Sequence, residues 1–108
     1  MKQAILCGKL LNTVKKRVDT DQVILVGDDR IQAVERREAI EIPEGYEIVD
    51  CSDRFVTPGL IDAHLHTAFD PMTYLKDYTG DGVIRGLINA KKDLLAGFTT
   101  LRDMGCTF

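Results

Sequence analysis

Tryptophan is absent from this 108-residue sequence, histidine occurs only twice, and proline and cysteine occur three times each. The cysteines, Cys7, Cys51 and Cys106, are odd in number, widely spaced and without a CxxC pair. This pattern argues against a disulfide framework and predicts reduced thiols, as in a cytoplasmic protein.

Long hydrophobic runs are also missing. The apolar run at residues 4–7 is shorter than the roughly 7 to 15 residues of a signal-peptide core. No stretch approaches the roughly 18 consecutive apolar residues of a membrane-spanning helix. We therefore expect a soluble, cytoplasmic protein that makes no membrane contact.

An excess of positive charge is absent as well, since 17 acidic residues outnumber 14 Lys and Arg residues and give a net charge of -3. The triplet Lys15-Lys16-Arg17 is too short to make a surface for nucleic acid and is predicted to be a solvated turn. With 44% hydrophobic and 29% charged residues, the composition is that of a globular protein with a modest core.

The first half of the sequence predicts short β-strands separated by polar turns. Residues 27–30 are predicted to form a hairpin turn between strands 22–26 and 31–34. The polar stretches 19–21 and 51–54 are predicted to end strands. The expected strands are 3–7 with a possible continuation to 11, 14–18, 22–26, 31–34, 47–50 and 55–56, which indicates a small sandwich-like β unit over residues 1–55.

The second half predicts a strand at 60–66, a loop, a helix at 81–96 and a strand at 98–103. The helix has one apolar stripe, with Thr79 or Asp81 as its N-terminal cap and Gly97 as its C-terminal cap. Strand, helix and strand at this spacing predict one βαβ unit with parallel strands.

Both histidines lie in the strand predicted at residues 60–66. Side chains two residues apart on a strand project from the same face about 6.6 Å apart, so His64 and His66 could reach one metal ion, with Asp62 on their face. Three ionisable side chains on a buried face need a partner, and a cation would provide it. The alternative is that they are ordinary polar residues on a solvent-facing strand.

Residues 56–66, VTPGLIDAHLH, closely resemble the first barrel strand of the amidohydrolase superfamily, whose signature reads PGLIDxHxH. Residues 97–105, GFTTLRDMG, resemble its second strand, most typically in the imidazolonepropionase-like and Xaa-Pro dipeptidase branch. Residues 26–34 and 48–50 resemble its N-terminal hairpin and the strand that leads to the barrel.

The resemblance implies an α/β protein in which residues 1–55 are the N-terminal part of a small composite β-sandwich domain. Residues 56–108 would then be the first βαβ unit of a (β/α)8 TIM barrel. Such a barrel needs about 250 residues, so we expect an N-terminal fragment that is inactive alone.

The resemblance also implies that His64 and His66 bind one or two divalent metal ions, with zinc as the first choice. Asp62 and Asp103 would not bind the metal themselves. They would contact and orient the metal ligands, or have a purely structural role. The remaining ligands, a carboxylated Lys or a Glu and two His, and the catalytic Asp would lie beyond this sequence. No catalytic residue is therefore assigned, and substrate-binding residues stay unassigned.

The expected activity of the complete protein is hydrolysis of an amide C–N bond by metal-activated water. The substrate would be a small molecule, such as a dipeptide, an N-acyl amino acid or a cyclic amide, and the parent protein is expected to be a homo-oligomer. Two alternatives remain open: a phosphotriesterase-like or lactonase-like hydrolase, and a barrel that has lost its metal and its activity.

Overall fold

The computed structural model describes residues 1–73 and 75–105, and the chain divides into two compact units, Met1–Pro58 and Gly59–Phe108. The predicted thiol Cys106 lies outside the described residues. Within the described part of the chain, no helix is long and apolar enough to cross a membrane.

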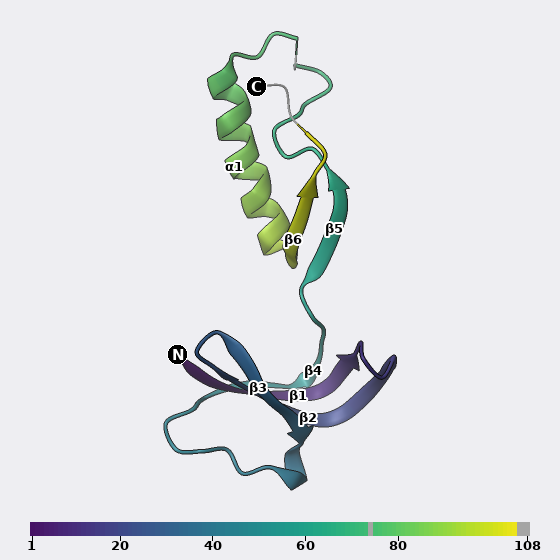
Figure 1. Ribbon diagram of the computed structural model, residues 1–108, viewed down its shortest axis with the longest axis vertical. Coiled ribbons are helices and arrows are strands. Elements are labelled where there is room, and N and C mark those ends of the chain that lie inside the picture. Colours follow the sequence, from purple (N-terminus) through teal and green to yellow (C-terminus); the bar gives the residue numbers. More distant parts are fainter. Residues whose placement is uncertain (74, 106–108) are drawn as a thin grey trace. The chain divides into compact units, whose positions relative to one another are not determined.

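The first unit is a four-stranded mixed sheet in the order β3-β2-β1-β4 (Figure 1). Its strands are β1 (Lys2–Asn12), β2 (Arg17–Gly27), β3 (Arg30–Arg36) and β4 (Glu47–Val56), with the short 3-10 helix η1 (Arg37–Ala39) after β3. β1 pairs antiparallel with β2 and parallel with β4. Because side chains alternate along β1, Ala4 and Leu6 belong to one apolar cluster, and Cys7, with Ile5 packed against it, belongs to a second cluster that also contains Leu10.

The predicted hairpin between β2 and β3 is confirmed. Its two central residues, Asp28 and Asp29, have φ angles of 53° and 62°. A two-residue turn with both φ angles positive matches the twist of the flanking strands, and Asp tolerates this conformation better than most side chains.

Two predicted turns are wrong, because residues 19–21 lie inside β2 and residues 51–54 lie inside β4. In β4 the polar stretch forms a bulge: Cys7 pairs with Cys51 and Lys9 pairs with Phe55, so Gly8 alone faces three residues. The predicted strand 14–18 is also wrong. Residues 13–16 form the turn between β1 and β2, which includes Lys15 and Lys16 of the basic triplet, whereas Arg17 begins β2. The unit has four strands instead of five or six.

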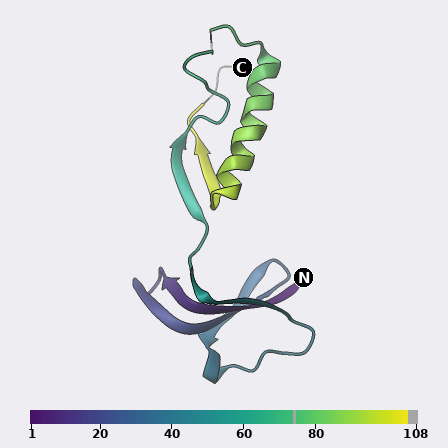
Figure 2. The same ribbon diagram turned by 180° about the vertical axis from the view of Figure 1, so that it is seen from behind.

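The second unit contains β5 (Leu60–Leu65), α1 (Thr79–Leu95) and β6 (Phe98–Asp103). β5 and β6 pair in parallel, which confirms the βαβ prediction. Figures 1 and 2 show α1 beside the two strands from opposite directions. The helix begins two residues earlier than predicted. The Asp81 carboxylate accepts the Tyr78 N–H at 2.9 Å, and Gly97 follows the last turn with φ of 99°.

Candidate metal site

His64 and His66 lie at the carboxyl end of β5 and its continuation, and their rings project toward the same side. The ring centroids are 5.7 Å apart with an angle of 68° between the planes. Both side chains are exposed in the described structure and Asp62 is half-buried, so the expectation of a buried ionisable face is not met. Whether the two imidazoles can bind a cation therefore depends on the hydrogen bonds that orient them.

The orientation of His66 is set by one hydrogen bond. Its Nδ1 lies 2.6 Å from the carbonyl oxygen of Gly105. A carbonyl oxygen can only accept, so Nδ1 must carry the proton, and in the neutral ring the lone pair is then on Nε2. Histidine ligands commonly donate their second ring N–H in this way, which fixes the tautomer that can bind a metal.

Asp62 contacts the backbone of the next histidine in the motif. One of its carboxylate oxygens accepts the His64 N–H at 3.0 Å. This local hydrogen bond is of the kind that Asp makes two residues along a chain. In this structure Asp62 therefore supports the strand segment that carries His64.

Asp103, the last residue of β6, ties that strand to the residue after His66. One carboxylate oxygen accepts the Thr67 N–H at 3.1 Å and the Thr67 hydroxyl. The other accepts the Gly105 N–H at 2.8 Å. Asp103 thus contacts both Thr67, which follows His66, and Gly105, whose carbonyl group accepts from the His66 ring.

Sequence reasoning missed the group of side chains that holds the loop after β5. Arg85 on α1 donates to the Ala68 carbonyl at 3.0 Å, to the Asp77 carboxylate at 2.6 Å and to the Thr73 hydroxyl at 3.0 Å. The Arg85 hydrogen bond lowers the pKa of the Asp77 carboxyl. No local pattern in the sequence indicates a loop as the partner of Arg85.

Asn89, one turn after Arg85, was also missed. Its side-chain amide donates to the Thr67 carbonyl at 2.8 Å. Residues four apart on a helix lie on one face, so both side chains reach the same short segment after His66. A helical period could have shown that they share a face but not what that face contacts.

The two histidines do not make a complete metal site by themselves. Among residues 1–73 and 75–105, no group of three or more His, Cys, Asp or Glu side chains is arranged to hold a metal ion. Catalytic zinc usually takes three protein ligands. His64 and His66 therefore fit as part of a ligand set.

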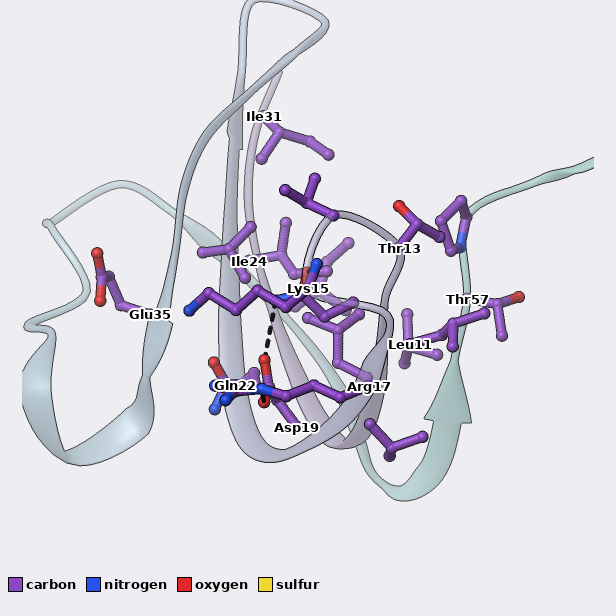
Figure 3. Close-up of a pocket in the computed structure, with 18 of the residues that line it drawn as sticks. Leu11, Thr13, Lys15, Arg17, Asp19, Gln22, Ile24, Ile31, Glu35 and Thr57 are labelled. Carbon is purple, nitrogen blue, oxygen red and sulfur yellow. Dashed lines mark hydrogen bonds and ion pairs between the residues drawn. The ribbon is translucent and has the colours of Figure 1, made fainter.

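A groove in the described structure lies elsewhere, within the Met1–Pro58 unit. Apolar side chains such as Leu11, Ile24 and Ile31 line it, and so do Arg17 and Asp19, whose ion pair is 2.6 Å long (Figure 3). Neither histidine contributes to this groove. Its lining is an open face of the sheet on which apolar side chains lie beside charged ones, including Asp19 and Glu35.

No family model matches the chain. Over 53 residues it is 45% identical to imidazolonepropionase of Bacillus velezensis, which covers 49% of this chain and 13% of that protein. Over 63 residues it is 38% identical to adenine deaminase 4 of Rhizobium meliloti, which covers 58% of this chain and 10% of that protein. The chain thus matches only a small part of the length of these relatives.

Solved structures resemble nearly the whole chain in fold. A Xaa-Pro dipeptidase with bound methionine superposes with a TM-score of 0.83 at 24% identity, covering 98% of this chain and 27% of that one. A putative prolidase from Bifidobacterium longum superposes with a TM-score of 0.77 at 27% identity, covering 96% and 23%. Together with the strand signatures, these likenesses show that the chain resembles part of proteins of the amidohydrolase superfamily.

Proposed function

We propose that the protein containing this segment is a metal-dependent hydrolase of amide C–N bonds, and that His64 and His66 are two of its metal ligands. The observation that carries the proposal is the hydrogen bond from His66 Nδ1 to the Gly105 carbonyl. It leaves Nε2 of the neutral ring as the lone-pair donor, beside a second imidazole with its ring centroid 5.7 Å away.

The residues of this chain would hold and orient the metal. His64 and His66 supply two imidazole nitrogens, Asp62 supports the backbone at His64, and Asp103 supports the backbone on either side of the His66 hydrogen bond. A divalent ion, for which zinc is our first choice, would lower the pKa of bound water to about 7 and polarise a scissile carbonyl. The remaining ligands and the general base are expected outside residues 1–108.

The proposed substrates are small amides: a dipeptide, an N-acyl amino acid or a cyclic amide. The names of the relatives support this range, since they include an imidazolonepropionase and a Xaa-Pro dipeptidase. They do not separate one amide from another.

The ligand assignment is tested by metal analysis of the full-length protein. His64→Ala and His66→Ala should each lower the zinc content per protomer well below that of the wild type. Lys91→Met is the matched control, because Lys91 is exposed on α1. Wild-type zinc content in both histidine variants would show that the assignment is wrong.

The reaction class is tested separately with purified metal-loaded enzyme. Xaa-Pro dipeptides, N-acyl amino acids and imidazolones should be hydrolysed. Activity confined to lactones or phosphotriesters would overturn the amide proposal. Absence of activity together with absence of metal would favour a barrel without catalytic function.

A further inference from the structure

The two residues directly after His66 are held from two different elements. From α1, Asn89 donates to the Thr67 carbonyl at 2.8 Å and Arg85 donates to the Ala68 carbonyl at 3.0 Å. From β6, the Asp103 carboxylate accepts from the Thr67 N–H at 3.1 Å. The backbone at Thr67 is therefore fixed on both its donor and its acceptor side.

Packing reinforces these hydrogen bonds. Ala68 is 7% exposed, which makes it a buried residue in a unit where most large apolar side chains are exposed. Gly86 on α1 lies against it, since a Cβ built at Gly86 would be 3.5 Å from the Ala68 Cβ. The helix thus approaches this point of the loop closely, between its two donor side chains at positions 85 and 89.

Arg85 also fixes the far end of the same loop. Its guanidinium bonds the Thr73 hydroxyl and the Asp77 carboxylate, and the side chains of Arg85 and Asp77 are 21% and 18% exposed. A planar guanidinium with several donors in fixed directions can hold three acceptors at once, which an ammonium group does less well. One side chain therefore fixes three positions of the loop between β5 and α1.

We propose that Arg85 and Asn89 are positioning residues for His66. By holding the carbonyl groups of Ala68 and Thr67, they fix the end of β5 and so keep the His66 Nδ1–H on the Gly105 carbonyl oxygen. The consequence for metal binding rests on the proposed function. The consequence for the His66 tautomer does not, because it concerns the metal-free ring.

The first test is made on the metal-free full-length protein by NMR of the histidine side-chain nitrogens. Wild-type His66 should show one tautomer, with the proton on Nδ1. Asn89→Leu, which keeps the side-chain size but removes the donor, should give a mixture of tautomers, and so should Arg85→Met. Lys91→Met, an exposed change on the same helix, should leave the single tautomer.

The second test is the zinc dissociation constant of the same variants. Asn89→Leu and Arg85→Met should each raise it about 10-fold, the lower end of the effect usual for groups that orient ligands. Arg85→Lys should raise it less than Arg85→Met, because an ammonium group can still donate to one of the three acceptors. Lys91→Met should not change it.

A purely structural role gives a different result. If Asn89→Leu and Arg85→Met lower the unfolding temperature but keep the single His66 tautomer and the wild-type zinc affinity, the positioning role is wrong. If Asn89→Leu does not fold, Arg85→Lys provides the same two readouts in a milder variant. If His66→Ala leaves zinc binding unchanged, the proposed function fails, while the tautomer measurement still decides the role of Arg85 and Asn89.

Discussion

At Gly8, strand β1 passes close to the neighbouring backbone of β4. A Cβ at this position would lie 2.0 Å from the Ser52 carbonyl oxygen, a backbone atom that cannot rotate away. Gly8→Ala should therefore distort the bulge and lower the free energy of unfolding of the Met1–Pro58 unit by about 3 kcal/mol, as overpacking does. Urea unfolding followed by circular dichroism would measure this loss.

Gly80 is a control for Gly8, because a side chain at this position would have free space around it. It lies in the first turn of α1, and a Cβ built there meets no atom within 4 Å. Gly80→Ala should stabilise the helix by about 0.5 kcal/mol, because Ala has the higher helix propensity. Equal effects of the two substitutions would show that the space around Gly8 does not explain its presence.

The ion pair of Asp77 with Arg85 should make stability depend on pH. The hydrogen bond from Arg85 holds the pKa of the Asp77 carboxyl below its usual value. The stabilisation is therefore complete above the usual carboxyl pKa of about 3.9 and is lost as the pH falls through the lowered pKa. The difference in unfolding free energy between wild type and Asp77→Asn should be constant from about pH 5 to 7 and should shrink below about pH 4.

The pH dependence of the wild type and Asp77→Asn can also contradict this prediction. If the difference between wild type and Asp77→Asn does not change between about pH 3 and 7, the charge of Asp77 does not contribute to folding. Arg85→Met should remove the same pH dependence, because the carboxyl then has no guanidinium partner.

At the scale of single elements, the start of helix α1 is stabilised by a hydrogen bond between a backbone N–H and a carboxylate of the first turn. Asp81 accepts the Tyr78 N–H at 2.9 Å and also places a negative charge in the first turn, where the helix dipole is positive. Asp81→Ala should lower helix content and reduce the unfolding free energy of the second unit by about 1 kcal/mol. Asp81→Glu, which keeps the charge, should lose less, and identical losses in both variants would contradict the capping role.

At the scale of the whole molecule, the 108-residue chain exposes apolar surface that folding usually covers. The stripe on α1 includes Ile84 at 61% and Leu87 at 70% exposure. Exposed apolar patches and unpaired strand edges favour association between molecules. The isolated chain should therefore associate in a concentration-dependent way, which sedimentation velocity would measure.

Substitutions on the stripe should reverse this behaviour. Ile84→Glu and Leu87→Glu should each shift the isolated chain toward the monomer. Lys76→Gln changes the net charge by the same amount at an exposed position in the loop before α1, so it should not have this effect. Equal effects of all three would indicate that net charge, and not apolar surface, controls association.

Features that depend on neighbouring residues could be predicted from the sequence alone. The alternation at residues 60–66 placed both histidines on one side, the Asp28-Asp29 pair predicted the hairpin, and the apolar period with Gly97 predicted the helix. Each of these patterns acts over a few residues, because strand geometry, turn conformation and helix capping are local. The strand signature also indicated the superfamily.

The partners of the polar groups depend on contacts between residues far apart in the sequence, which are visible only in the folded chain. The His66 ring bonds a carbonyl 39 residues away, Thr67 bonds Asp103 across 36 residues, and Asn89 reaches back 22 residues. Pairing across the sheet likewise kept the polar stretch 51–54 within β4, where a turn was expected, because Gly8 leaves room for the bulge. The packing of separate elements against one another sets these partners, and short sequence patterns do not predict them.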